Sequence, residues 1–480
     1  MTQFVNQAAP VEPLDEEALV RLERGWRRIV SELGIQFDEP NALRLFEDAG
    51  QRVEGTLVRF DPDFLLEQLS SAPARFDLLA RNPERDATVG EGHTVFLPAQ
   101  GAPFVRRHGV RRDGTLADFE DLVRIAQHLD DLDSPGGLPC EPNDRPLDSR
   151  HLDMTHALLR LSDKPVMGAQ ISRVAARDSI AMARIVLGER SDDGPCLHTV
   201  INVNSPLRYD GRMIEALLEH AAAGSAIVVT PFLLMGAMAP VTIAAALAQQ
   251  TAEALAGIAL VQLVRPGCPV VLGSFLSNTD MKNGSPGFGG PETAVGLLAS
   301  GQLARRLGVP WRSGGGSLTS SPVADAQAAY EGTVTMTAAL QAGANMVMHT
   351  TGWLEGGLTV GFEKIAVDVE IVRTLRAALA PITVDETSLA FDAHAEVGHA
   401  GHFFGAAHTL ERFRDCFYRP VLSTTDNFER WTRNGSVDAA ARAGPLVDEW
   451  LAAYEQPLLP DDVAEELDEY VTRRRRELGD

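Results

Sequence analysis

The sequence predicts an α/β protein, namely a TIM (β/α)₈ barrel with an N-terminal helical and small-sheet segment and a C-terminal helical extension. Short apolar segments alternate with amphipathic segments along the middle of the chain, an order typical of parallel strands joined by right-handed helical connections. An open doubly wound sheet is the alternative, but no glycine-rich phosphate-binding fingerprint follows the first strand. The chain has 480 residues, of which 45% are hydrophobic, enough for a large barrel with appended helices.

Residues 1–114 form the predicted N-terminal segment. Helical periodicity marks residues 14–33 and 40–49. Residues 94–107 alternate between apolar and polar types and contain Gly and Pro, which suits a small sheet or hairpin.

The predicted barrel spans residues 115–380 and opens with a helix, since Thr115 is a suitable N-cap and Asp118 lies in the first turn. Its strand candidates are at 133–138, 165–169, 197–202, 226–230, 269–273, 310–313 and 345–349. The helices that accompany them are predicted at 148–161, 175–187, 210–223, 241–263, 291–307, 324–341 and 362–379. An eighth strand is needed to close a barrel, and either residues 96–105 or the chain after Pro381 could supply it.

Residues 381–480 are predicted to form a C-terminal helical extension packed on the barrel, with residues 422–480 helical and acidic. The extension contains three close histidines, His394, His399 and His402. A helical pair of this kind could share a metal, but Gly398 and Gly401 disfavour a helix here. A loop that packs over the barrel is therefore the preferred interpretation, and no bound metal is expected.

Charge and composition exclude several function classes. Asp and Glu number 66 against 43 Lys and Arg, a formal charge of −23, and the one basic run, at 473–476, lies among acidic residues, so nucleic-acid binding is not expected. The four cysteines lack CxxC spacing, which favours a reduced, cytoplasmic protein. The long apolar zone at 237–263 is interrupted by Thr, Gln and Glu; a buried helix is expected there, and neither a membrane span nor a secretory leader elsewhere.

Three segments, at 273–292, 314–331 and 343–357, each combine a short apolar stretch with a glycine-rich polar loop. In a barrel such loops meet at the carboxyl ends of the strands and carry the active site. Residues at or just after the strand ends are thus the substrate-binding candidates: Asn202, Asn204, Phe232, Met235, His349 and Trp353. Asn204 could equally form a turn, Met235 is more often a packing residue, and His349 could be a structural histidine.

Glu355 and His349 are the candidate catalytic residues. Glu355 lies between an apolar pair and two glycines, where a carboxylate has little structural work to do. No nucleophile elbow, P-loop or HExxH motif is present. Lys282 or Lys364 could in principle form a Schiff base.

Five segments together resemble the trimethylamine methyltransferase family: APVTIAAALAQQTAEALAG, GGPETAVGLLASGQLARRLGVP, DAQAAYEG, GANMVMHTTGWLEGG and GHFFGAAHT. The resemblance runs from about Thr115 into the C-terminal region. It implies a TIM-barrel methyltransferase that passes a methyl group from a methylamine to the cobalt of a corrinoid carried by a separate small protein. Every residue is of a standard type, without the pyrrolysine of the archetype, so the chain resembles the branch that includes glycine betaine methyltransferases.

The chemistry of a quaternary amine suits this branch, because a quaternary ammonium leaves as a neutral tertiary amine without an acid. Phe232, Trp353 and Met235 are expected to contact the ammonium group. Asn204 and His349, with Asn202 behind them, are expected to bind the carboxylate of a betaine. Glu355 could offset the ammonium charge or organise its own loop. The residues expected beside the corrinoid are Gly314, Gly315, Gly316 and Asp280.

Two other functions remain open at this point. One is a metal-assisted lyase or hydrolase that uses the histidines between His394 and His402, and the other is a non-catalytic binder of quaternary amines. Carnitine, proline betaine and choline-like compounds share the reacting group of glycine betaine. A homo-oligomer is also expected.

Overall fold

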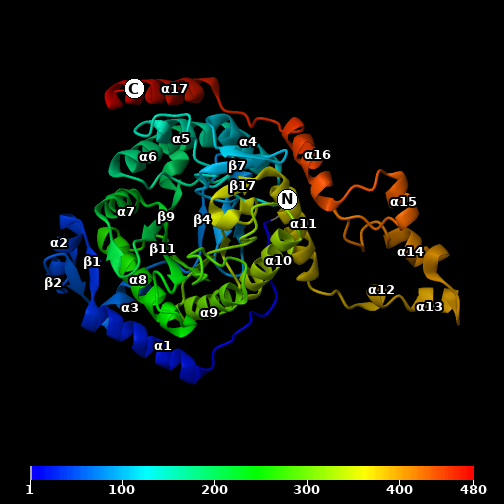
Figure 1. Ribbon diagram of the computed structural model, residues 1–480, viewed down its shortest axis with the longest axis horizontal. Helices are drawn as coiled ribbons and strands as arrows, with labels where there is room; N and C mark the ends of the chain where they lie inside the picture. Colours follow the sequence, from blue (N-terminus) through cyan, green and yellow to red (C-terminus); the bar gives the residue numbers. More distant parts are fainter. Residues whose placement is uncertain (1–2, 480) are drawn as a thin grey trace.

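A parallel sheet forms the centre of the protein in a computed structural model, which describes residues 3–479 (Figure 1). Its strands run in the order β9-β11-β12-β14-β15-β6, and every neighbouring pair is parallel. The strands are β9 (His198–Val203), β11 (Ala226–Met235), β12 (Val270–Gly273), β14 (Trp311–Ser313), β15 (Met346–Val347) and β6 (Val95–Phe96). The second half of β11 also pairs with β13 (Phe275–Asn278).

Main-chain hydrogen bonds continue the ladder beyond both edges of this sheet. Asp133 N donates to Phe96 O at 2.9 Å, and Gly168 N donates to His198 O at 2.8 Å. Between them, Met167 N donates to Gly136 O at 3.1 Å.

The two segments that make these bonds, 133–138 and 165–169, were predicted as strands. They are irregular apart from an isolated bridge at Met167, because Pro135, Gly136 and Gly137 interrupt the first of them. Of the two candidates for an eighth strand, residues 96–105 supply part of β6 and the start of β7, whereas residues 382–479 contain no strand.

Eight helices surround the sheet in chain order (Figure 1), and each contacts the next along the chain. They are α4 (Leu116–His128), α5 (Arg150–Leu161), α6 (Arg173–Leu187), α7 (Gly211–Ala223), α8 (Ile243–Val264), α9 (Pro291–Leu307), α10 (Ala326–Gln341) and α11 (Phe362–Ala378). The predicted helices are confirmed to within a few residues. Thr115 and Asp118 form the capping box of α4, as predicted.

Helix α8 is the buried helix predicted from the apolar zone at 237–263. By length and composition it could cross a membrane, but 83% of its most apolar stretch is buried inside the protein. It lies between the sheet and the helices of the N-terminal segment, contacting β11, β12, α1 and α3. A helix that is apolar on all sides, as α8 is, and that is buried in this way is typical of a protein core.

The N-terminal segment contributes to both the outside and the centre of the fold. Its helices α1 (Glu16–Arg28), α2 (Pro40–Asp48) and α3 (Pro62–Ser70) pack on α8. A small sheet beside them contains β1 (Ile35–Phe37), β2 (Arg52–Glu54), β3 (Leu57–Arg59) and β10 (Arg208–Tyr209). Since β6 belongs to the central sheet, residues 1–114 also provide one of its strands.

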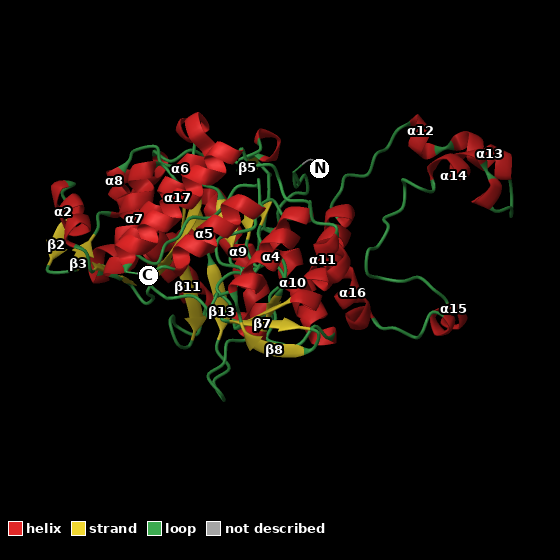
Figure 2. Cartoon of the chain, turned by 90° about the horizontal axis from the view of Figure 1, so that it is seen from above, coloured by secondary structure: helices red, strands yellow, loops and turns green. Residues whose placement is uncertain are grey.

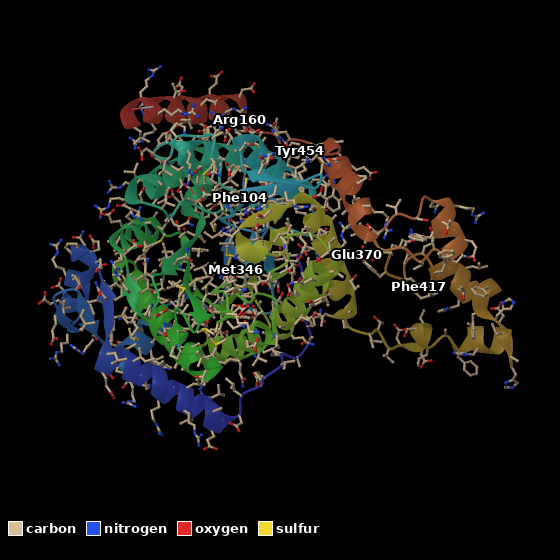
Figure 3. The ribbon with its side chains drawn as sticks, in the orientation of Figure 1. Phe104, Arg160, Met346, Glu370, Phe417 and Tyr454 are labelled. Carbon is tan, nitrogen blue, oxygen red and sulfur yellow. The ribbon has the colours of Figure 1, made fainter. Side chains whose placement is uncertain are left out.

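Two further small sheets lie at the ends of the central one. Strands β4 (Phe76–Leu78) and β5 (Ala87–Val89) pair with each other, and their apolar side chains join a core cluster with Val200, Val228 and Met346. Figure 3 places Met346 near the middle of the ring of helices. The other sheet contains β7 (Phe104–Arg107), β8 (Val110–Asp113), β16 (Trp353–Leu354) and β17 (Thr359–Gly361). The predicted sheet or hairpin at 94–107 is divided between two sheets, since β6 lies in the central one and β7 forms its hairpin with β8 instead.

The C-terminal extension packs on the body only in part. Helix α16 (Ala439–Ala452) contacts α11 and α4, and α17 (Asp461–Leu478) contacts α5 and α6. Four short helices form an arm that projects from the body in Figures 1 and 2: α12 (Glu386–Leu389), α13 (Phe391–Val397), α14 (Ala407–Arg412) and α15 (Phe428–Arg433). The His394 ring meets Phe403 edge to face and the His402 ring lies tilted against Phe404. Residues 3–479 contain no cluster able to hold a metal.

Candidate functional site

Polar side chains line the inner face of the sheet at the carboxyl ends of its strands. Residues paired across a parallel ladder share a face. Asn202 pairs with Thr230 in the ladder between β9 and β11. Each of them lies two residues after a member of the core cluster inside the sheet, Val200 in β9 and Val228 in β11. Because Asn202 is exposed although it lies on this face, the inner face is open to solvent at this end.

Arg312 lies on the same inner face. It pairs with Gly273 on one side and with Met346, a member of the inner cluster, on the other. The Thr230 hydroxyl fills the place that a side chain at Gly273 would take, since a Cβ there would come within 2.0 Å of it. Thr230 and Arg312 therefore face each other across a position that has no side chain.

Arg312 is a cation buried in the protein interior. Only 3% of the residue is exposed, and its hydrogen-bond neighbours are Ser274 O at 3.2 Å and His349 Nε2 at 3.3 Å. Within residues 3–479 it forms no ion pair, and its Nε has no partner. Burial lowers the pKa of Arg312 to about 9, so the guanidinium still carries its charge at neutral pH.

His349 lies between Arg312 and the chain near β6. Its backbone is in the left-handed region at φ 58°, and its Nδ1 lies 3.3 Å from Gln100 N. Burial, together with the charge of Arg312, lowers the pKa of His349 well below its ordinary value, so the imidazole is neutral. A neutral imidazole has one acceptor nitrogen, yet N–H donors of Gln100 and Arg312 face both nitrogens.

Four aromatic side chains gather with the His349 ring, and we name this set the aromatic cluster: Phe232, Phe275, Phe288, Trp353 and His349. Ring centroids are 4.8 Å apart for Phe232 and Phe275, and 4.3 Å apart for His349 and Trp353. Phe288 lies 5.4 Å from Trp353 and 5.2 Å from Phe275. Phe232 is the partly exposed member, so the cluster has one face accessible from solvent.

Glu355 is directed to Arg111 and Thr359. Its carboxylate accepts from Arg111 Nε and from the Thr359 hydroxyl, both at 2.7 Å. Partial burial would raise the pKa of Glu355, but the hydrogen bonds from Arg111 and Thr359 outweigh this effect and lower the pKa. Of the two roles that the sequence left open, this geometry fits the organisation of the loop that follows Trp353.

Two other predicted substrate residues lie apart from the aromatic cluster. Asn204 forms a turn, since its Oδ1 accepts from Asp210 N at 2.9 Å. Met235 packs with Leu233, Ala246 and Leu276 in a separate apolar cluster beneath α8. The structure thus groups Phe232, His349 and Trp353, and places Asn202 on the inner face nearby.

The residues predicted to lie beside a corrinoid are mostly enclosed. Gly314, Gly315 and Gly316 are buried, and a Cβ on them would clash with Ser274 O at 2.4 Å, with Leu318 at 2.2 Å and with Met336 at 2.5 Å. Close packing of the backbone explains these glycines. Asp280 is exposed and holds its own loop by accepting from Lys282 N at 2.9 Å.

Lys364 offers no free amine for a Schiff base. It is fully buried, forms an ion pair with Asp368 and lies near Ser317 O. Burial raises the pKa of Asp368 to about 6, although Lys364 acts in the opposite direction.

Sequence reasoning missed Phe275, Phe288 and Arg312. A signal existed for Arg312, since it is a lone cation in the predicted strand 310–313, and arginine is rarely buried without a partner. Phe275 follows a glycine that ended the predicted strand at 273, and Phe288 lies in a long loop, so neither belonged to a predicted element.

A family model described as trimethylamine methyltransferase matches residues 1–479. Glycine betaine methyltransferase of Desulfitobacterium hafniense (strain Y51) is 38% identical over 470 residues, which cover 97% of this chain and 98% of that protein. Trimethylamine methyltransferase of Desulfitobacterium hafniense (strain DSM 10664 / DCB-2) is 28% identical over 477 residues, covering 97% and 94% of the two chains.

Among solved structures, the monomethylamine methyltransferase of Methanosarcina barkeri superimposes with a TM-score of 0.53 at 10% identity, covering 98% of this chain and 89% of that one. This likeness concerns the fold. The match of the family model to nearly the whole sequence establishes that the chain belongs to the trimethylamine methyltransferase family.

Proposed function

We propose that this protein transfers a methyl group from a quaternary amine, such as glycine betaine, to the cobalt of a corrinoid held by a separate small protein. The aromatic cluster carries the proposal. A quaternary ammonium has no N–H to donate, so it is recognised by aromatic faces, and Phe232 presents one beside the open inner face of the sheet. Membership of the family and the 38% identity to a glycine betaine methyltransferase support the same reaction class.

Reduced cobalt supplies the nucleophile in this reaction. The methyl carbon accepts its electron pair, and the electrons of the broken C–N bond remain on nitrogen, which departs as a neutral tertiary amine. No proton is needed on the leaving group. The aromatic cluster would orient one methyl group outward and exclude water from the ammonium, and these are contributions of positioning and desolvation.

The corrinoid is proposed to arrive on its own carrier. The packed glycines Gly314, Gly315 and Gly316 have no open side toward it, so we assign them no contact with it. Asp280, exposed on the loop after β13, remains a residue that a docked carrier could touch.

We also infer that the central sheet closes as a (β/α)₈ barrel. The segments around Asp133 and Met167 would occupy the two places between β6 and β9, and their main-chain hydrogen bonds support this arrangement. The barrel would comprise residues 115–380 together with β6, flanked by the segments 1–114 and 381–480.

The protein is further proposed to be a cytoplasmic homo-oligomer. Cys140, Cys196 and Cys268 are buried free thiols, which suits a reducing compartment. The projecting arm exposes large apolar side chains, namely Phe391, Phe404, Phe417 and Phe428, and Figure 3 places Phe417 on this arm, far from the sheet. Exposed apolar side chains gathered in this way favour burial against a second copy.

Light scattering of the full chain tests the oligomer. Serine at Phe391, Phe404 and Phe417 together should shift the mass toward that of one chain, whereas V241S, at an exposed position on the body, should not. A monomeric wild-type protein would contradict the proposal.

A spectroscopic assay tests the reaction. The protein is mixed anaerobically with cob(I)alamin and glycine betaine, choline or trimethylamine, and the methylcobalamin spectrum is followed. We expect methylation with a quaternary amine and none with trimethylamine. Absence of methyl transfer from every quaternary amine, even with a corrinoid protein from a related organism, would refute the proposed activity. Binding without transfer would then indicate the non-catalytic alternative, and stoichiometric zinc or iron in the purified protein would indicate the metal-dependent one.

A further inference from the structure

We propose that Arg312, with Thr230 and His349, forms a carboxylate-binding site beside the aromatic cluster, and that the substrates of this protein are quaternary amines that carry a carboxylate. This inference rests on the proposed function and narrows it. It excludes choline-like and tetraalkylammonium compounds as good substrates, because they would meet the Arg312 guanidinium without a carboxylate to pair with it.

The first support is the unmatched charge of Arg312. An isolated cation in a protein interior is costly unless it is paired and hydrogen-bonded. A guanidinium has five N–H donors, but among residues 3–479 that of Arg312 has only Ser274 O and the His349 ring within hydrogen-bond distance, and its Nε has no partner there. A ligand carboxylate would supply the missing negative charge and the missing acceptor oxygens.

The second support is the surplus of donors around His349. The Gln100 amide and Arg312 Nη2 both point N–H groups at a ring that can accept only one of them when neutral. If Nδ1 accepts from Gln100, the Nε2–H faces the guanidinium, so two donors meet without an acceptor. A carboxylate oxygen between them would accept from both.

The third support is the Thr230 hydroxyl. It is buried and has no hydrogen-bond partner within residues 3–479. It lies on the same inner face as Arg312, with only Gly273 between them. Because Gly273 has no side chain, the Thr230 hydroxyl lies over it and on the side of Arg312, so two polar groups that lack partners among the described residues are neighbours across one glycine. Asn202, which pairs with Thr230 on the other side, is exposed.

The position of Arg312 relative to the aromatic cluster matches the length of a betaine. The guanidinium carbon lies 5.7 Å from the Phe275 ring centroid, and Phe275 lies 4.8 Å from Phe232. In a betaine only a short carbon chain separates the ammonium from the carboxylate, so both ends can be bound at once. A quaternary amine without a carboxylate would instead meet an unscreened cation, which acts against its binding.

Equilibrium binding by calorimetry tests this assignment on the full-length protein. The ligands are glycine betaine, choline, which lacks the carboxylate, and 3,3-dimethylbutanoate, which keeps the carboxylate and shape but lacks the ammonium charge. The variants are R312M and T230V, with R177M as the control, because Arg177 is exposed on α6 and pairs with Glu219 far from this site.

We expect R312M to weaken the binding of glycine betaine and of 3,3-dimethylbutanoate by about 10- to 100-fold, because charged hydrogen bonds to the carboxylate are lost. Choline should bind R312M as well as, or better than, the wild type. T230V should weaken the binding of the two carboxylates several-fold and leave the binding of choline unchanged. This comparison can be made even if R312M fails to fold. R177M should match the wild type.

Equal losses for glycine betaine and choline in R312M or in T230V would overturn the carboxylate site. The same variants are assayed for methyl transfer, which separates the two proposals. Carboxylate-selective binding without methyl transfer in the wild type would refute the proposed function alone. Methyl transfer from glycine betaine with unselective losses in R312M would refute the carboxylate site alone.

Discussion

Glu355 is the residue whose role the sequence left most open, and its ion pair with Arg111 allows a decisive experiment. E355Q keeps the size of the side chain and removes its charge. Arg111 and Glu355 remain 35% and 30% exposed, so solvent screens the pair and limits its contribution to about 0.5–1 kcal/mol. Weakening the bond to the Thr359 hydroxyl adds about 1 kcal/mol. We therefore expect E355Q to lower the free energy of unfolding by about 1–2 kcal/mol.

Urea unfolding and the methyl-transfer assay are then applied to E355Q, R111M and the double variant. If Glu355 organises its loop, R111M reproduces the losses of E355Q, kcat/KM falls by no more than about tenfold, and the double variant resembles each single one. If Glu355 acts in the chemistry, E355Q should lose about 100-fold or more in kcat, the effect of removing a catalytic acid or base, while R111M does not. That result, with unchanged stability, would refute the structural role.

The pH dependence of stability provides an independent check on this pair. The folded-state pKa of Glu355 lies below its ordinary value of 4.5, so the folded protein holds this carboxylate ionised more strongly than the unfolded chain does. Its contribution is therefore fully present above about pH 4.5 and is lost as the pH falls through the folded-state pKa. E355Q should be less stable than the wild type at neutral pH, and the difference should shrink below pH 4.5. A difference that grows on acidification would contradict the assignment.

Three further predictions concern the inner face and the core. H349A should weaken the binding of glycine betaine more than that of choline. N204A should affect the binding of both ligands equally, because the Asn204 side chain holds a turn. Calorimetry of the two variants measures both affinities. F232L should weaken the binding of every quaternary amine by about fivefold, because a cation–π contact of about 1 kcal/mol is lost. An unchanged affinity would show that Phe232 is not part of the site. K364M should destabilise the fold by about 3–5 kcal/mol by leaving Asp368 buried and unpaired, which urea unfolding would detect.

Much of the fold follows from the alternation of apolar and amphipathic segments. Periodicity located most of the helices to within a few residues, because they bury one side and expose the other. Helix α8, which is buried on all sides, was located by its length and apolar composition. Hydrophobicity alone predicted strands at 133–138 and 165–169, but Pro135, Gly136 and Gly137 interrupt the first of them. Hydrogen bonds to β6 and β9 nevertheless hold both segments beside the sheet. The projecting arm was also unforeseen, because apolar residues such as Phe391 and Phe404 predict packing but do not indicate against what.

The candidate site was harder to predict than the fold, for a physical reason. His349, Phe232 and Trp353 could be found because they follow strands that end at the same edge. Met235 also lies near this edge, but it is three residues after Phe232 in β11, so alternation along the strand directs it to the opposite face with Leu233 and Leu276. The predicted strand ended at residue 230, and the alternation was therefore not extended to Met235.

Arg312 links the shape of this site to its choice of substrate. An ammonium bound at the aromatic cluster would lie roughly 6 Å from the guanidinium, and two like charges at that distance repel by about 3 kcal/mol at an effective dielectric constant of about 20. A carboxylate about 4 Å from the guanidinium gains about 4 kcal/mol under the same assumption, so a betaine overcomes the repulsion while choline cannot. Trimethylammonium would meet the same cation without compensation. The charge that is costly to bury in the free protein thus favours a betaine over choline in the proposed carboxylate site.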